Sequence, residues 1–155
     1  MGLDMYLYAE KYFHTVYEQD KEKVNQLIDI AGLNELTKHR GHCTATVKVE
    51  VGYWRKVNSI HNYFVQKHAN GVDECQEIRV SREDLKELKD ICGQLSVSKD
   101  VGLAEELLPP QSGFFFGSTE IDERYFNDMD YTYELLDRVL KETPDDCDFV
   151  YVASW

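Results

Sequence analysis

The sequence predicts an α+β domain, with about three to four helices packed on one face of a mostly antiparallel sheet. Residues 3–10 and 44–51 alternate between apolar and polar side chains, as strands with one buried face do. Other segments carry apolar residues at helical spacing, and they interleave with the strands without a regular strand–helix–strand rhythm. The chain has 155 residues, which fits a single domain over residues 1–155.

The N-terminal half is expected to contain two strands and two helices. The expected elements are, in order, a strand at 3–13, a helix at 20–31, a polar loop at 33–43, a strand at 44–51 and a helix at 53–71. Gly32 ends the first helix and Gly52 ends the second strand in this interpretation. Along the second strand, Ala45, Val47, Val49 and Val51 alternate with polar residues and are expected to face the core.

The C-terminal half is expected to be mainly helical. The expected elements are a short strand at 76–80, a helix at 81–95, one helical turn at 103–108, a long helix that begins at Ser118 or Thr119, and a buried strand at 148–155. Ser81 and Asp84 have the spacing of a capping box. The apolar seam of the long helix consists of Tyr125, Met129, Tyr133, Leu136 and Leu140.

The charge distribution limits the choice of partners. The formal net charge is −12, which repels long nucleic acids and anionic membranes. Residues 36–70 nevertheless contain six cations, one anion and four of the five histidines. This basic segment could hold a small anion, or it could pair with acidic neighbours in the fold.

The four cysteines and the apolar segments favour a cytoplasmic protein. No CxxC pair occurs, so we expect free thiols in a reducing compartment. The N-terminus has no basic region followed by an apolar run, and no segment is long and apolar enough for a membrane span. The many tyrosines suit a subunit interface or a core equally well, so the oligomeric state stays open.

The stretch PPQSGFFFGSTEID, residues 109–122, has two interpretations. Its three phenylalanines lie between glycines, so an extended segment is expected with Phe114 and Phe116 on the same side. Ser118 and Thr119 then lead into a helix N-terminus, where hydroxyls and free N–H groups suit a phosphate or carboxylate. Acidic residues already follow at that positive end, so the alternative is a structural turn and cap.

The segment YWRKVNSIHNYF, residues 53–64, also has two interpretations. On a helix, Trp54, His61 and His68 would share the apolar side. They are either satisfied core residues or the floor of a pocket. In a pocket, Trp54 would stack on a planar ligand, while His61 and a nearby Arg55 or Lys56 would bind its charge.

No metal or cofactor motif is evident. KHRGHC, residues 38–43, contains metal-ligand residue types but lacks the second half of a zinc signature, so a basic loop is expected. The sequence also lacks GxSxG, Walker, GxGxxG, HExxH and EF-hand patterns. We therefore expect no metal and no cofactor, and the balance favours a protein that is not an enzyme.

Four stretches are distinctive when taken together: MGLDMYLY (1–8), VGYWRKVNSIHNYFV (51–65), LLPPQSGFFFGSTEID (107–122) and the terminal Ser-Trp. They resemble an uncharacterised family of small proteins from bacteriophages and bacterial genomes, over most of the chain. The family usually has Thr where this chain has Pro110, and often Trp where it has Tyr63. The resemblance implies a compact accessory protein, of a class that often modulates host processes or defences by binding.

Three functional hypotheses follow. The first is a phage-type protein that sequesters a small, anionic, nucleotide-like ligand, such as a host defence signal. Its binding residues would be Trp54, Arg55, Lys56, His61, Gln111, Ser112, Ser118 and Thr119. The second is an acidic interaction module that inhibits a host nucleic-acid-binding protein. The third is a phosphoester hydrolase that uses His61 as acid or base.

Overall fold

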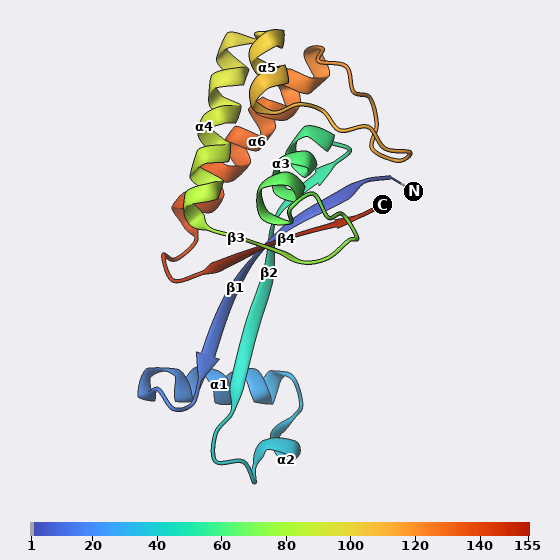
Figure 1. Ribbon diagram of the computed structural model, residues 1–155. Coiled ribbons are helices and arrows are strands. Elements are labelled where there is room, and N and C mark those ends of the chain that lie inside the picture. The colour runs from blue at the N-terminus through green and yellow to red at the C-terminus, as the bar shows by residue number, and fades with distance from the viewer. Residues whose placement is uncertain (1) are drawn as a thin grey trace. The chain divides into compact units, whose positions relative to one another are not determined.

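The computed structural model describes residues 2–155 and has an α+β architecture, as the sequence predicts (Figure 1). Its elements are β1 (Asp4–His14), α1 (Glu18–Ile30), α2 (Asn34–Thr37), β2 (Thr44–Arg55), α3 (Asn58–His68), β3 (Ile78–Val80), α4 (Arg82–Ser98), α5 (Val101–Leu107), α6 (Glu123–Glu142) and β4 (Asp148–Ser154). The four strands form one antiparallel sheet. The described residues form six helices, more than the three to four expected.

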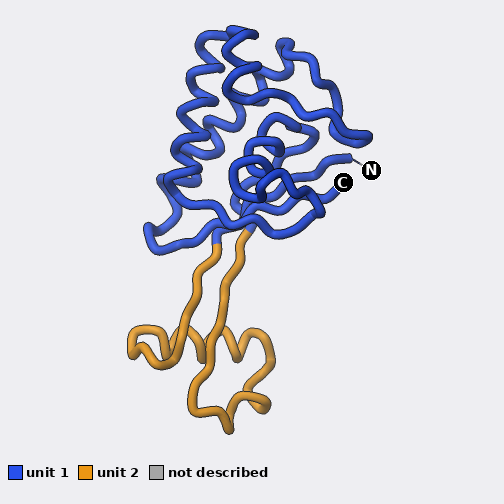
Figure 2. Tube along the Cα trace, viewed as in Figure 1, with its two compact units in different colours: residues 1–9, 50–155 blue, residues 10–49 orange. Residues whose placement is uncertain are grey.

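The described residues divide into two compact units (Figure 2). The main unit comprises residues 2–9 and 50–155, and the small unit comprises residues 10–49. Strands β1 and β2 each contribute residues to both units. The single domain expected for residues 1–155 stays a prediction, because units that share strands need not fold separately.

The sheet has the strand order β2-β1-β4-β3. Strands β3 and β4 pair antiparallel, with Ile78 opposite Tyr151 and Val80 opposite Phe149. These four side chains are buried and belong to the main core, together with Met5 and Leu7 of β1 and Trp54 of β2. One face of the sheet therefore forms the floor of the core in the main unit.

Helices α3, α4 and α6 contribute buried residues to this same core. Phe64 of α3 stacks on Tyr151 of β4 with ring centroids 4.2 Å apart. Trp54 of β2 donates a hydrogen bond from Nε1 to Thr132 Oγ1 of α6, over 3.0 Å. Ring packing thus positions α3 on the sheet, and a satisfied buried polar pair positions α6.

The predicted end of the second strand at Gly52 is wrong, because β2 continues to Arg55. A Cβ atom at position 52 would lie 3.0 Å from Leu135 Cδ2 and 3.3 Å from Leu7 Cβ, so the glycine permits close approach of neighbouring elements. The helix expected from residue 53 begins at Asn58 instead. Between them, Lys56 turns the chain with a φ of 60°, in the left-handed region.

The small unit contains α1, α2 and the distal parts of β1 and β2. Only Val24 of α1 is buried, although Leu27, Ile28 and Ala31 lie on the predicted stripe and are exposed or half-buried. The loop expected at 33–43 contains the short helix α2. Val49 is exposed, contrary to the prediction that it faces the core.

The phenylalanine segment forms a turn, so the extended segment expected there is wrong. The N–H of Phe116 donates to the carbonyl of Gly113 over 3.1 Å. Phe116 is 6% exposed and Phe114 is 94% exposed, so the two rings do not share a side. Gly117 has a φ of 90°, which a residue with a Cβ rarely adopts, and this conformation completes the turn.

Asn58 holds this loop against α3. Its Nδ2 donates to the carbonyls of Phe116 and Ser118, over 3.1 and 2.8 Å, and its Oδ1 accepts from the N–H of Gln111 over 3.2 Å. The side chain is buried. One asparagine therefore satisfies three backbone groups of the segment 111–118.

The helix caps were predicted in part. Ser81 caps α4 in a complete capping box with Asp84, which confirms that prediction. Helix α6 begins later than expected, and Asp122 caps it by accepting from the N–H of Tyr125. Of the predicted seam of α6, Tyr125, Met129 and Leu136 are buried, whereas Tyr133 is exposed.

Replacing Asn58 by Ala leaves three backbone groups of the loop without their partner. We expect the free energy of unfolding to fall by about 2–4 kcal/mol. A fully buried group that loses a hydrogen bond costs about 1–3 kcal/mol, and only the bond to Phe116 is fully buried, whereas those to Ser118 and Gln111 are part-buried and cost less. Urea unfolding followed by circular dichroism measures this. Asn62→Ala is the matched control, since Asn62 bonds only Pro109 of this loop and lies nearer the surface. An equal loss for both variants would contradict the role of Asn58.

Candidate functional site

Trp54 and Arg55, two of the predicted ligand residues, point to opposite faces of β2. Trp54 is 1% exposed, and its indole bonds Thr132, so no ring face is available for a ligand. Arg55 is exposed and lies 3.8 Å from a carboxylate oxygen of Asp4 on β1. Because adjacent strand residues point to opposite faces, these two side chains cannot serve one pocket. The stacking role expected for Trp54 is therefore wrong.

His61 is a core residue. It is 1% exposed, and both ring nitrogens have partners: Nδ1 lies 2.7 Å from Tyr151 Oη, and Nε2 lies 2.9 Å from Asp73 Oδ2. Trp155 Nε1 donates to the other oxygen of Asp73 over 3.2 Å. A substrate has no access to either nitrogen, so His61 cannot act as the acid or base of a phosphoester hydrolase in this conformation.

Lys56 and Ser118 are the predicted ligand residues that the structure brings together. They line a cleft with Asn58, Ser59 and the start of α6, but its volume is only about 30 Å³. This is room for about one water molecule. Of the remaining predicted residues, Gln111 is half-buried with its backbone bonded to Asn58, and Ser112 and Thr119 are exposed on the loop. The predicted pocket is thus nearly filled by protein atoms.

The same cleft is acidic. Glu120, Asp122 and Asp128 line it, together with Arg124. Burial raises the pKa of Asp128, Arg124 opposes this, and Asp122 adds to the rise. The carboxylates already lie at the N-terminal end of α6, where an anionic ligand would have to compete with them.

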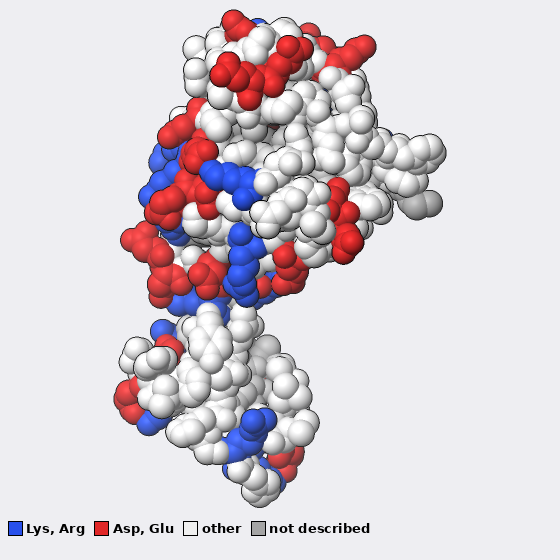
Figure 3. Space-filling model, viewed as in Figure 1, with Lys and Arg blue, Asp and Glu red and all other residues white. Residues whose placement is uncertain are grey.

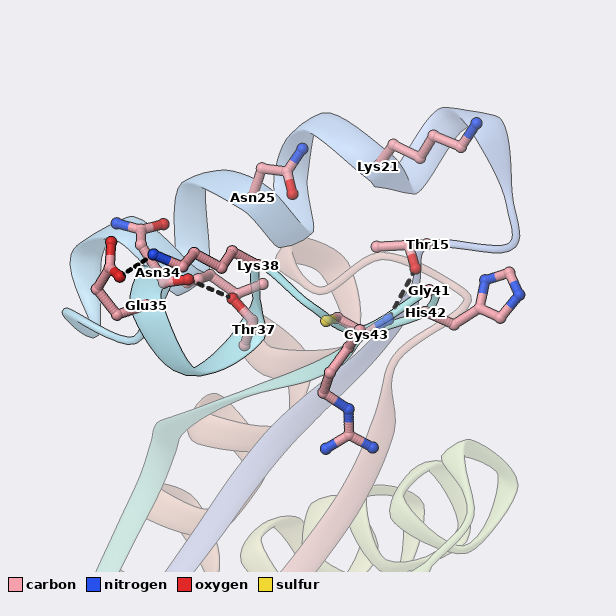
Figure 4. Close-up of a pocket in the computed structure, with 12 residues that line it drawn as sticks. Thr15, Lys21, Asn25, Asn34, Glu35, Thr37, Lys38, Gly41, His42 and Cys43 are labelled. Atoms are coloured by element: carbon pink, nitrogen blue, oxygen red, sulfur yellow. Dashed lines mark hydrogen bonds and ion pairs between the residues drawn. The ribbon is translucent and has the colours of Figure 1, made fainter.

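A larger hollow lies wholly within the small unit (Figure 4), and we call it the small-unit hollow. Its volume is about 600 Å³, within the range of small-molecule sites. It is lined by Thr15, Lys21, Asn25, Ile28, Asn34, Glu35, Thr37, Lys38, Arg40, Gly41, His42 and Cys43. A second hollow of about 350 Å³ shares Ile28, Thr37, Arg40, His42 and Cys43 with it.

The walls of the small-unit hollow are held by local hydrogen bonds. Thr15 N–H donates to the carbonyl of Cys43 over 3.0 Å, and Cys43 N–H donates to Thr15 Oγ1 over 2.9 Å, which joins the end of β1 to the start of β2. Asn34 Nδ2 donates to Asp29 Oδ1 over 2.9 Å, which ties α2 to α1. Figure 4 shows Asn25 on α1 and Lys38 after α2 on different walls of the hollow.

The polar groups of the small-unit hollow favour an anion. Three cations (Lys21, Lys38 and Arg40) and one anion (Glu35) line it. Lys38 pairs with Glu35, and Lys21 pairs with Glu18. Within residues 2–155, the guanidinium of Arg40 has no hydrogen-bond or ion-pair partner. It is therefore free to make the bidentate contacts that phosphate and carboxylate groups accept.

The whole net charge lies outside the small unit. Residues 10–49 contain six cations and six anions, so the net charge of −12 belongs to the remaining residues. An anion that approaches the small unit thus meets no net local repulsion, although distant acids act on it through a screened field.

The sequence contained part of the signal for the small-unit hollow. The basic segment predicted at 36–70 includes Lys38, Arg40 and His42, and KHRGHC supplies much of one wall. The sequence predicts only a polar loop at residues 33–43, because the helix α2 has four residues and leaves no periodic pattern that would reveal it. The contributions of Thr15, Lys21 and Asn25 depend on tertiary structure and carry no sequence signature.

The described residues include neither a cluster of metal-ligand side chains nor a helix that could cross a membrane. Between residues 2 and 155, no three His, Cys, Asp or Glu side chains cluster in a way that could hold a metal ion. Over the same range, every helix is too short or too polar to cross a bilayer.

Comparison with known proteins assigns no family to the chain. No family model matches it, and neither a curated protein nor a solved structure matches it significantly.

Asp128 offers a test of the electrostatics of the cleft. Because its pKa is raised in the folded protein, the charged carboxylate lowers stability above that pKa, and the cost vanishes at lower pH where the group is protonated. We expect Asp128→Asn to raise the melting temperature at pH 7 by about 1–3 °C, and to raise it less as the pH falls.

Differential scanning calorimetry across pH 4–8 measures this effect. Glu134→Gln is the control, since it also removes one charge from α6 but at an exposed position. Equal stabilisation by both variants, or a gain that grows toward acid, would show that burial of Asp128 is not the cause.

Proposed function

We propose that the protein binds and sequesters a small, anionic, nucleotide-like ligand, and that the small-unit hollow is the binding site. The observation that carries the proposal is a polar hollow of about 600 Å³ with more cations than anions, in an acidic chain. This keeps the class of ligand expected from the sequence but moves its site away from Trp54 and the phenylalanine loop.

The lining suits both ends of such a ligand. Arg40 and Lys21 would bind the phosphate, since Arg40 is unpaired within residues 2–155 and Lys21 has only an exposed partner. Asn25 and Thr15 would donate to or accept from the base or sugar. No residue of the hollow forms an acid–base pair with a nucleophile, so the proposed role is binding without turnover.

The proposed setting follows from the resemblance to small phage and bacterial proteins. A cytoplasmic accessory protein that removes a host signal nucleotide would lower its free concentration by mass action. Such a role needs tight binding and abundance, and it does not need a catalytic residue.

A thermal-shift screen tests the proposal with cyclic and linear nucleotides, pyrophosphate and inorganic phosphate at about 1 mM. A ligand at 100 times its dissociation constant stabilises the folded state by about 2.7 kcal/mol, which such a screen detects. Calorimetric titration then gives the dissociation constant of any hit. Absence of stabilisation by every probe would refute nucleotide sequestration.

The site itself is tested by Arg40→Gln, with Arg138→Gln on α6 as the matched control. A charge-assisted hydrogen bond contributes about 1.5–3 kcal/mol, so we expect Arg40→Gln to weaken binding at least about tenfold. Arg138→Gln should leave it unchanged. Equal weakening by both would move the site out of the small unit.

The charge of the main unit supports a second proposal, an acidic module that occupies a basic surface of a host nucleic-acid-binding protein. Residues 120–148 contain eleven acids and three cations (Arg124, Arg138 and Lys141). Figure 3 shows many acidic side chains along the side of the main unit formed by α4 and α6, with Lys and Arg side chains lying among them. Such a field attracts basic partners and weakens with salt.

Affinity capture from host lysate at low and high salt tests this second proposal. We expect the wild-type protein to capture basic nucleic-acid-binding proteins at low salt. The double variant Glu123→Lys, Glu134→Lys should no longer capture them. Glu22→Lys in the small unit is the control for charge reversal elsewhere. Capture that is unaffected by salt and by both reversals would exclude the acidic surface as the determinant.

A further inference from the structure

The most exposed large apolar side chain of the main unit is an aromatic ring at the tip of a loop. Phe114 is 94% exposed, and its ring packs edge-on against Phe115 with centroids 4.8 Å apart. Exposure of a Phe ring to water is unfavourable by roughly 1.5–3 kcal/mol compared with burial. The turn is held firmly by Asn58, so the ring is presented by a fixed backbone.

The segment around this ring is uncharged. Residues 107–119 contain no Asp, Glu, Lys or Arg, although 30% of the chain is charged. In Figure 1 the loop after α5 projects from the main unit, and Figure 3 shows no charged side chains on that projection. Two copies of this acidic protein would therefore repel least where these loops meet.

The same segment also forms one wall of an apolar groove. The groove lies between α3 and the end of α5 and has a volume of about 290 Å³. We call it the α3–α5 groove; it is lined by Ser59, Asn62, Tyr63, Gln66, Lys67, Leu107, Leu108 and Pro109. A cavity of about 150 Å³ is enough for a benzene ring, so the groove can take a phenyl side chain.

The charge of the groove is balanced. Lys67 is its only charged residue, and it pairs with Asp84 and Glu87 over 3.2 and 2.6 Å. Tyr63 Oη accepts from Lys67 and donates to the carbonyl of Asp84. The rim thus has no unpaired charge that an apolar ring would bury at high cost.

We propose that the protein forms a twofold dimer, in which Phe114 of each copy inserts into the α3–α5 groove of the other. Ring and groove lie within one short segment, at most about 18 Å apart along the chain from Pro109 to Phe114. With a twofold axis between two such segments, both rings can be buried in both grooves at the same time. The interface is then closed and leaves no free ring or groove for a third copy.

Sedimentation velocity over a range of concentrations tests the dimer, with the intact chain in about 0.3 M salt to screen repulsion. We expect a reversible monomer–dimer equilibrium. Phe114→Ser removes two buried rings per dimer and should raise the dissociation constant about a hundredfold or more. Because Phe114 contacts solvent almost entirely, this variant should keep its fold. Val97→Ser, at an 87% exposed position of α4, is the control and should change nothing.

A complementation experiment distinguishes this specific contact from nonspecific hydrophobic association. Gln66→Trp fills the groove from an exposed position of α3, and it should abolish the dimer while leaving Phe114 in place. A mixture of Phe114→Ser and Gln66→Trp retains one intact ring and one intact groove, so it should form a heterodimer that neither variant forms alone.

A wild-type protein that stays monomeric up to about 1 mM would overturn the proposal and leave Phe114 for a different protein or a lipid surface. A dimer that survives Phe114→Ser would overturn it too, as would a variant mixture that remains monomeric. The nucleotide screen is independent of these outcomes, since the small-unit hollow shares no residue with the proposed interface.

Discussion

The close approach of β2 to α6 at Gly52 determines the arrangement of the main unit. A side chain at that position would meet Leu135 and Leu7 within 3.0–3.3 Å. Because glycine leaves this space, the strand runs on beneath the helix and buries Trp54 against Thr132. Because Trp54 is buried, its indole ring cannot stack on a ligand. The close packing at Gly52 is thus the reason that no ligand site forms around Trp54.

Much of the fold could be predicted because its signals are local. The capping box of Ser81 and the buried positions of Met129 and Leu136 follow from spacing alone, and they are found as expected. The errors occur where tertiary contacts outweigh the local pattern. A glycine at position 52 predicts the end of a strand, but here it permits close packing within the strand. The Gly113–Phe116 turn depends on hydrogen bonds to Asn58, which is distant in the sequence.

The candidate site was predictable in chemistry but not in position. A basic segment within an acidic chain indicated affinity for a small anion, and Arg40 lies in that segment. The side chains expected around His61 could bind an anion, but both ring nitrogens of His61 form hydrogen bonds within the protein, to Tyr151 and Asp73. Sequence cannot distinguish a histidine that meets a ligand from one that meets a tyrosine, because the partner of each depends on folding.

The two tryptophans occupy unlike surroundings, which makes the chain its own optical reporter. Trp54 is enclosed between β2 and α6, whereas Trp155 is 44% exposed and lies beside Phe116 with ring centroids 6.0 Å apart. We expect the emission of Trp54 to be blue-shifted and shielded from soluble quenchers, and that of Trp155 to be closer to the emission of an indole in water. Acrylamide quenching can therefore follow the phenylalanine turn separately from the interior, without any added label.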